Sequence, residues 1–249
     1  MNTRVLTTLT ALTALALAAP AARAQTLVPR GLVSINGGLQ SPSRTFGDTF
    51  TFDRYVEQAT VRSDYEVKSA PLFDGGFSVR LWGPLGVGVA FARFSHTGTA
   101  TVEGSIPHPF FFDRGRAISG EVSSVKRNET AVHAQVMAYL PAGSKVLVAL
   151  FAGPSFLTVE QSLVTRVSYD EAYPFDEATF RSATLTRERE KKTGFNAGAD
   201  VTVMLTRTFG VGGLIRFSQV TVDLPIDGDR TLSVEAGGLQ AGGGIRIVF

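Results

Sequence analysis

The most regular feature of the chain is an alternation of apolar residues with polar or small ones at a period of two. Successive side chains of a β-strand point to opposite faces, so this alternation predicts strands with one apolar face. Each run is close to the 9–11 residues that cross a bilayer as a tilted strand. Run 146–157 is apolar on both faces, which leaves its facing open. The eight predicted strands are 33–40, 73–82, 86–92, 131–140, 146–157, 195–206, 211–218 and 239–249.

The connections between these runs alternate in length. Tight turns are expected at 83–85, 141–144 and 207–209, where glycine, proline or short polar segments interrupt the pattern. Long polar stretches fill the other connections, at Ser41–Lys68, Thr97–Ser124, Glu160–Lys192 and Thr221–Thr231. Short turns on one side and long loops on the other are typical of transmembrane β-barrels. The sequence therefore predicts an all-β fold: an antiparallel up-and-down transmembrane β-barrel of about eight strands, with long extracellular loops and short periplasmic turns.

A soluble barrel of lipocalin type is the competing fold, because it also alternates polar and apolar positions but turns its apolar face inward. The charged residues separate the two folds. They gather in one phase of the strands, while the other phase is almost free of charge. A transmembrane barrel explains this pattern, with apolar side chains facing lipid and charged side chains facing the lumen. The predicted lumen charge network is Asp74, Arg80, Arg127, Glu129, Asp200, Arg216 and Arg246.

The first residues resemble a secretory signal. Arg4 is followed by an uncharged apolar run, and Ala22 and Ala24 form a small-x-small cleavage site before Gln25. We expect a signal peptide over 1–24, a barrel domain over 25–249, and a final location in the cell outer membrane. Two of the 24 basic residues belong to the leader, which leaves 22 against 22 acidic ones and gives no case for a nucleic-acid partner. The sequence has no cysteine, so disulfides, thiolate metal sites and lipidation at a cysteine are not expected.

The last strand resembles the C-terminal insertion strand of bacterial outer-membrane barrels. Gly244, Ile245, Ile247 and Phe249 carry this resemblance, since the apolar phase ends on a terminal aromatic residue. At the level of pattern, the likeness covers the whole region after the leader. It extends to the eight-stranded barrels of the OmpA-transmembrane and OmpW type. The resemblance implies that the barrel-insertion machinery reads this strand during biogenesis. Because the sequence ends with this strand, we expect a lone barrel without a following peptidoglycan-binding domain.

Three groups of residues are candidates for chemistry outside the charge network. The spacing of the histidines His96, His108 and His133 does not suit a metal site. No serine lies at catalytic spacing from them on the same face of a strand, and a serine on a neighbouring strand remains an open alternative. The aromatic cluster Phe110, Phe111 and Phe112 is expected to dock on the barrel rim or to enter the outer leaflet; a hydrophobic ligand mouth is the alternative. The charged run 187–192 is expected to be a solvated strand extension, with contact to lipopolysaccharide phosphates as the alternative.

The function that follows is a structural or surface-interaction role, not an enzymatic one. Eight strands enclose a lumen just wide enough for side chains to fill, so the charges are expected to plug it as ion pairs. We expect a monomer without cofactor or metal, in contact with outer-membrane lipid and lipopolysaccharide. The OmpW resemblance offers the second hypothesis, binding or passage of a small hydrophobic compound. The third is a lipid A-modifying enzyme.

Overall fold

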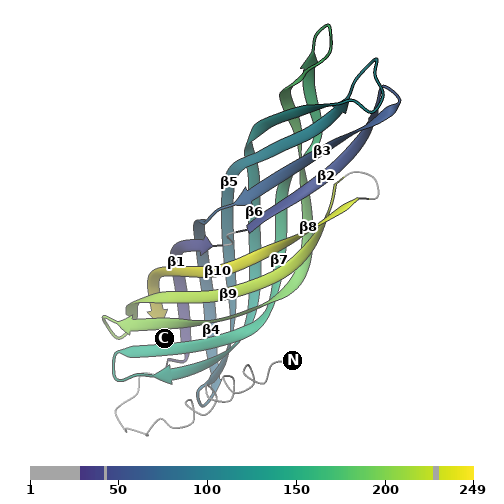
Figure 1. The fold of residues 1–249 in the computed structure, drawn as a ribbon. Helices are drawn as coiled ribbons and strands as arrows, with labels where there is room; N and C mark the ends of the chain where they lie inside the picture. Colours follow the sequence, from purple (N-terminus) through teal and green to yellow (C-terminus); the bar gives the residue numbers. More distant parts are fainter. Residues whose placement is uncertain (1–28, 42–43, 227–229) are drawn as a thin grey trace, which may run out of the picture.

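A computed structural model describes residues 29–41, 44–226 and 230–249. The predicted signal peptide and its cleavage site at Ala22, Ala24 and Gln25 lie outside these residues. The described chain is almost entirely antiparallel β-structure (Figure 1). None of the described residues form a helix long and apolar enough to cross a membrane. The strands are β1 (Gly31–Ser41), β2 (Arg44–Arg54), β3 (Glu57–Val67), β4 (Ala70–Trp82), β5 (Leu85–Pro107), β6 (Gly115–Pro141), β7 (Val146–Glu171), β8 (Ala178–Met204), β9 (Phe209–Pro225) and β10 (Thr231–Val248).

Eight of these strands form the closed ring of a barrel. The sheet order is β2-β3-β5-β4-β1-β10-β9-β8-β7-β6, and an additional β5–β6 pairing closes it. The β2–β3 hairpin lies outside the ring, because β1 pairs directly with β4. Instead, β3 pairs with the far end of β5. The prediction of about eight barrel strands is confirmed, and the hairpin is an addition that the sequence pattern did not reveal.

The outer face of the ring is an apolar band. Valine, leucine, isoleucine and phenylalanine side chains point outward along each ring strand and are exposed, as in Val87, Val89 and Phe91 of β5. On five strands, phenylalanines mark the upper border of this band, which is the border away from the short turns. They are Phe73, Phe91, Phe156, Phe195 and Phe217. At the other end Trp82, Phe209 and Phe249 are exposed. An apolar band between two aromatic girdles is the surface that a transmembrane barrel presents to a bilayer.

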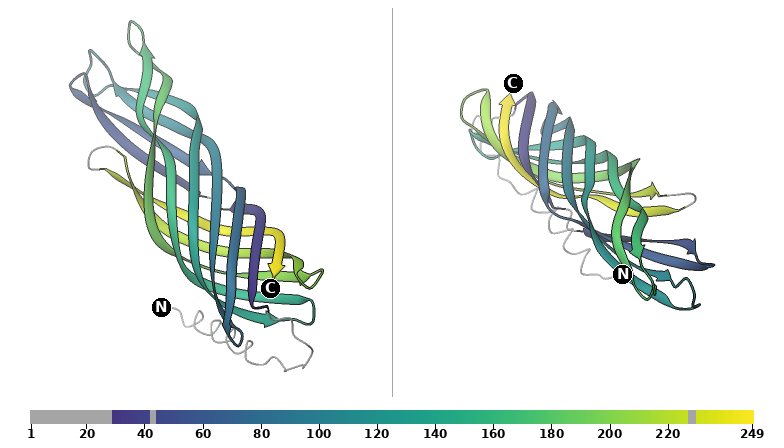
Figure 2. Two further views of the ribbon diagram at one scale, coloured as in Figure 1. Left: turned by 180° about the vertical axis from the view of Figure 1, so that it is seen from behind. Right: turned by 90° about the horizontal axis from the view of Figure 1, so that it is seen from above.

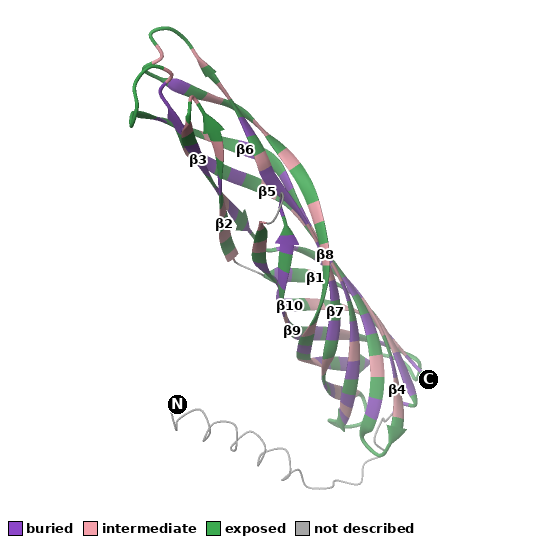
Figure 3. Ribbon diagram, turned by 90° about the vertical axis from the view of Figure 1, so that its right-hand side faces the viewer, coloured by how far each residue is buried: buried purple, intermediate pink, exposed green. Residues whose placement is uncertain are grey.

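Above the band, the polarity of the strands reverses. On β5, the outward positions change from Phe91 to Arg93 and Ser95, while the inward positions change to buried Phe94 and Val102. The ring strands β6 to β10 also continue beyond this level, with mostly polar residues facing outward and apolar residues facing inward. The alternating burial along these extensions is visible in Figure 3. An extracellular head therefore continues the transmembrane barrel, and it has the polarity of a water-soluble protein.

The head has its own hydrophobic core. Its side chains come from β2, β3, the start of β4 and the extended ends of β5 to β10, and include Tyr65, Val102, Leu163 and Val222, all at most 2% exposed. The backbone pairing opens between some neighbours here: β6 and β7 pair only below Arg127, and β8 and β9 only below Phe195. The hairpins therefore splay apart above the ring (Figure 2). Side-chain packing, more than a continuous sheet, holds the head together.

The connections agree with prediction at one end of the barrel and differ at the other. Short turns join β4 to β5, β6 to β7 and β8 to β9, at the predicted places. Gly83 has a φ of +55°, a left-handed conformation that favours glycine in such a turn. The stretches expected to be long loops are mostly strands instead. The sequence did not reveal these segments as strands, because their polar residues point outward and their apolar residues point inward. This is the reverse of the alternation in the membrane-crossing strands.

The chain closes the barrel at Phe249. Its backbone N–H donates to the Gly31 carbonyl oxygen at 3.1 Å, and its own carbonyl accepts from Gly31 N–H at 2.9 Å. The Phe249 ring stacks near Phe77, with centroids 6.4 Å apart. Gly244 faces β1 so closely that a Cβ there would collide with the Ile35 carbonyl oxygen. These contacts join the first and last strands of the ring.

Candidate functional site

Six residues of the predicted charge network form three buried ion pairs in the lumen. Arg216 Nη1 lies 2.6 Å from Asp74 Oδ2, and both side chains are 2% exposed. Arg127 Nη2 lies 2.7 Å from Glu129 Oε1, with equally little exposure. The third pair joins Arg246 to Asp200 through two guanidinium nitrogens. The seventh residue, Arg80, lies apart near the short-turn end, where its Nη1 reaches only the Gly83 carbonyl at 3.5 Å.

Amide side chains connect the three pairs into one network. Asn36 donates to Asp74 at 3.0 Å and accepts from Arg246 at 2.6 Å. Gln240 accepts from Arg216 at 3.2 Å and donates to Gln40 at 2.8 Å. Gln40 then donates to Glu129 at 2.8 Å. Buried charges need such partners, because an unpaired charge is very costly away from water. The amides were not singled out in the sequence, although their inward phase on β1 and β10 could have identified them.

Apolar layers lie on both sides of this polar layer. Towards the short turns, the lumen holds a cluster that includes Tyr139, Leu147 and Phe151. Leu32, Met204 and Val248 form a further cluster. On the opposite side, the core of the head begins at residues such as Leu72, Phe94 and Leu157. Buried side chains thus lie at three levels along the lumen.

A buried serine contacts one of the histidines. Ser155 of β7 lies 2.7 Å from His133 Nδ1 of β6, and Asn196 Nδ2 donates to the same Ser155 oxygen at 2.9 Å. This is the cross-strand serine that sequence spacing left open. Both His133 and Ser155 are fully buried, and no carboxylate among the described residues is bonded to the imidazole. The pair therefore lacks the access and the orienting acid that a nucleophile needs.

In the head, Glu171 at the end of β7 joins three hairpins. The buried Arg116 of β6 lies 2.6 Å from Glu171 Oε2, and Arg54 of β2 lies 3.2 Å from Oε1. The Tyr55 hydroxyl also donates to Glu171. Burial alone would raise the pKa of the Glu171 carboxyl, but the hydrogen bonds from Tyr55, Arg116 and Arg54 outweigh it and lower the pKa. The ionised carboxylate thus fastens the ends of β2, β6 and β7 together.

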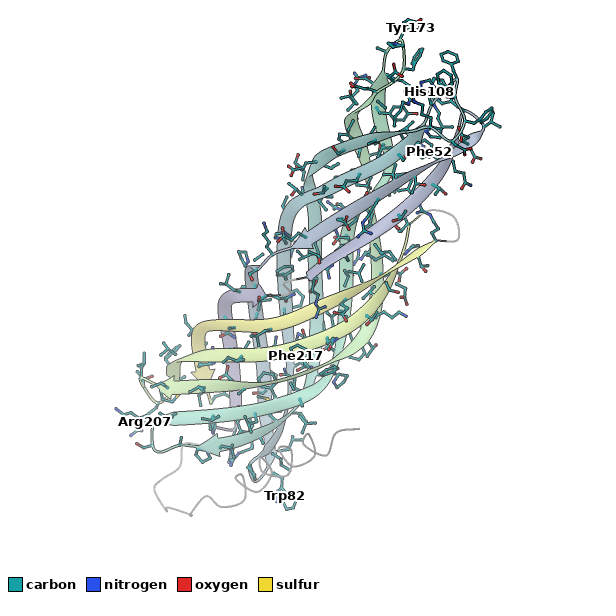
Figure 4. All side chains as sticks on the ribbon, viewed as in Figure 1. Phe52, Trp82, His108, Tyr173, Arg207 and Phe217 are labelled. Atoms are coloured by element: carbon teal, nitrogen blue, oxygen red, sulfur yellow. The ribbon has the colours of Figure 1, made fainter. Side chains whose placement is uncertain are left out.

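The phenylalanine cluster lies at the tip of the head. Phe110, Phe111 and Phe112 occupy the connection between β5 and β6, beside His108, which Figure 4 labels near the top with Tyr173. The apolar band, with Phe217, lies far below. The prediction that these rings dock on the barrel rim or enter the outer leaflet is therefore wrong. It was wrong because β5 and β6 continue as strands well beyond the membrane, which lifts their connection away from the rim.

The charged run 187–192 lies on β8 as an extension of the strand. Arg189 lies 3.5 Å from Glu160, and Lys192 lies 3.3 Å from Asp223, all with exposed or half-exposed side chains. One edge of β8 is unpaired here, and charged residues are a common protection of such an edge. Within the described ranges, no group of histidine and acidic residues is placed to hold a metal ion.

Comparison with known proteins finds likeness in structure alone. No protein-family model matches the chain, and no curated protein matches it in sequence. The outer-membrane protein OprG from Pseudomonas aeruginosa is similar in structure, with a TM-score of 0.50 and 12% identity, covering 89% of this chain and 97% of that one. Neisserial surface protein A has a TM-score of 0.42 at 12% identity, covering 88% and 95% of the two chains. The attachment invasion locus protein Ail of Yersinia pestis has a TM-score of 0.39 at 12% identity, covering 87% and 99%.

OprG is an outer-membrane protein, and the chain has its β-barrel fold. The predicted resemblance to eight-stranded barrels of OmpA and OmpW type is confirmed at that level. The apolar band between aromatic girdles agrees with this fold and with the expected location in the cell outer membrane.

Proposed function

We propose that this protein is a plugged outer-membrane barrel that acts through its extracellular head. The observation that supports the proposal is the layering of the lumen, where a polar layer of three ion pairs lies between two apolar layers. An eight-stranded barrel has no room for a water channel beside so many inward side chains. The barrel then serves as an anchor, and the surface available to partners is the head. We expect it to work as a monomer.

Planar-bilayer recording of the purified protein tests this function. The plugged lumen predicts no stable conductance steps at moderate voltage. A matched variant, Arg216→Ala together with Asp74→Ala, removes one complete ion pair from the polar layer and should increase leakage if that layer contributes to the seal. Regular single-channel steps from the unmodified protein would contradict the proposal.

One observation favours a second function, binding of a small hydrophobic compound. A cleft of about 560 Å³ lies in the head between β2 and β7. Aromatic rings of Phe50, Phe52 and Tyr169 line it, together with the guanidinium groups of Arg54 and Arg230. This composition suits a ligand with an apolar body and an anionic group. Fluorescence of a naphthalene sulfonate dye should rise on binding and fall in Phe52→Ser; an unchanged titration in this variant would argue against the cleft.

We infer no catalytic role from the serine and histidine in the lumen. Ser155 and His133 are enclosed, and the pair lacks an acid partner. A lipid A acylase or deacylase would need its nucleophile open to the outer leaflet. Overexpression should therefore leave the mass of lipid A unchanged. A mass shift that disappears in Ser155→Ala would overturn this inference.

A further inference from the structure

The tip of the head exposes an unusual set of apolar side chains. These side chains belong to three connections between strands, and we call them the tip patch. Three aromatic contacts make much of it continuous: Phe111 lies on His108 at 4.9 Å, Phe110 meets Phe175 at 5.6 Å, and Tyr173 meets Phe175 at 6.2 Å. The tip patch consists of Val56 (95% exposed), Phe110 (67%), Phe111 (56%), Phe112 (75%) and Tyr173 (85%). A soluble surface rarely leaves so many large apolar groups together without a binding role.

Polar contacts hold the connections that carry the tip patch. Arg114 Nη2 lies 2.9 Å from Asp176 Oδ1, which joins the β5–β6 connection to the β7–β8 connection. The Asp113 N–H donates to Glu57 Oε1 at 2.9 Å, which joins the first of these to the β2–β3 turn. Buried Arg116 donates to the Phe175 carbonyl at 3.2 Å. A patch organised in this way loses little conformational entropy when a partner binds.

The protein's own membrane is too distant to cover the tip patch. Phe91 marks the upper border of the apolar band on β5, and β5 continues to Pro107. At about 3.3 Å per residue, these sixteen steps give a path of roughly 50 Å along the strand. In Figure 4, Tyr173 lies at the tip of the head and Phe217 lies in the ring far from it. The occupant must therefore come from outside the cell surface.

The charge around the tip patch indicates what kind of occupant fits. The three tip segments 53–57, 107–116 and 170–178 contain seven carboxylates and three arginines. A hollow of about 480 Å³ lies beside Tyr173. Arg181 and Arg114 bind two of its carboxylates, Asp170 and Asp176, while Glu177 has no ion-pair partner among the described residues. The acidic residues lining the hollow are Asp170, Glu171, Asp176 and Glu177.

We propose that the tip patch and the acidic hollow together form a docking surface for a cationic protein segment with an apolar face. The inference deepens the proposed function, because it rests on the head being the part that meets partners. Apolar side chains of the segment would cover Phe110, Phe112 and Tyr173, and a lysine or arginine would enter the hollow near Glu177. The same negative charge disfavours an anionic membrane as the occupant. Aromatic anchors with a charged neighbour are the usual centre of a protein interface.

A short amphipathic helix of leucine and lysine is a suitable probe, with a leucine–glutamate helix of the same pattern as its control. Binding is measured to the full-length protein in phosphatidylcholine nanodiscs, against empty nanodiscs. The variant Phe110→Ser, Phe112→Ser and Tyr173→Ser should bind the lysine peptide at least about tenfold more weakly. Trp82→Ser removes an exposed aromatic from the opposite end and should leave binding unchanged. All variants should show the same folded mobility on cold gel electrophoresis.

A second variant tests the charge. Glu177→Gln should weaken binding of the lysine peptide about threefold and make it less sensitive to salt, because one fixed charge is lost from the hollow. Glu121→Gln, on the outward face of β6 away from the tip, is its matched control. A leucine–glutamate peptide that binds as tightly as the lysine peptide would overturn the charge assignment.

Three results would overturn the proposal as a whole. The lysine peptide could fail to bind above empty nanodiscs, or bind the triple variant as well as the unmodified protein. The reconstituted protein could instead sediment with phosphatidylglycerol vesicles in a manner that depends on Phe110, Phe112 and Tyr173, which would assign the tip patch to a membrane. Failure here is distinguishable from failure of the proposed function, because conductance reports on the lumen and peptide binding reports on the tip.

Discussion

The ion pair between Arg216 and Asp74 offers the sharpest test of the lumen. Replacing Arg216 by Met removes the guanidinium but keeps a long apolar side chain. Asp74 then keeps only the hydrogen bond from Asn36 Nδ2 at 3.0 Å, in a site where it is 2% exposed. A buried charge that loses its partner typically costs about 3–5 kcal/mol of unfolding free energy. With a urea dependence of about 1–3 kcal/mol per molar, the unfolding midpoint should fall by at least about 1 M.

The paired replacement separates the ion pair from simple loss of packing. Asp74→Leu combined with Arg216→Met removes both charges, and such an exchange is often neutral or stabilising. We therefore expect the double variant to recover most of the loss. Arg207→Met, in the exposed turn between β8 and β9, is the matched control and should change stability by less than about 0.5 kcal/mol. The assay is urea unfolding of protein refolded in detergent. If Arg216→Met unfolds at the same urea concentration as the unmodified protein, Arg216 faces water and the account of the lumen is wrong.

Three further predictions concern the head and the last strand. The Tyr65 hydroxyl accepts a hydrogen bond from the Val164 N–H at 2.8 Å, so Tyr65→Phe should destabilise the protein by about 1–3 kcal/mol. Burial also raises the pKa of Tyr65 to about 12, and ultraviolet titration of this variant should lack the tyrosine ionisation at that high pH. Because the Glu171 pKa is lowered in the folded head, the stability that its carboxylate gives the head is present above the ordinary pKa of 4.5 and is lost as the pH falls below it. Amide hydrogen exchange, corrected for intrinsic rates, should then accelerate around Arg54 and Arg116 but stay slow in the ring. The same acceleration on acidification in the Glu171→Gln variant would refute this. Deletion of Phe249 should reduce outer-membrane yield in cells far more than refolding yield in detergent, and equal yields in both would remove the insertion-signal role.

The ring could be predicted from sequence because its pattern has a single physical cause. Lipid demands an apolar outer face, and buried charges in the narrow lumen demand polar partners, so residues such as Val201 and Asp200 alternate across the membrane. The charges needed for the lumen network could be identified from their phase alone. Their pairing could not, because it depends on the register between distant strands, as in Arg216 with Asp74.

The head could not be predicted because its strands have the opposite polarity to the membrane strands, with polar residues outward and apolar residues inward. Between Phe91 and Arg93 the outward phase of β5 turns polar, so the segment beyond resembles a hydrophilic loop when it is compared with a membrane strand. Its apolar residues, such as Val102 and Ile106, then face a second core that no single segment reveals. For the same reason Phe110 was expected at the rim of the barrel, whereas it lies beyond the end of a long strand.

The strands β5 to β10 cross the membrane with their apolar side outward and continue into water with their polar side outward. Nitroxide labels at single cysteines along β5 test this most directly, because the chain has no cysteine of its own. Labels at Val89 and Phe91 should relax faster with oxygen, which dissolves in lipid, while labels at Ser95 and Thr97 should relax faster with a water-soluble nickel complex. The change should fall between Phe91 and Ser95 in the protein reconstituted in bilayers. The account would be contradicted if the labels at all four positions responded mainly to nickel. It would also be contradicted if the switch from oxygen to nickel accessibility fell at a distant point of the strand.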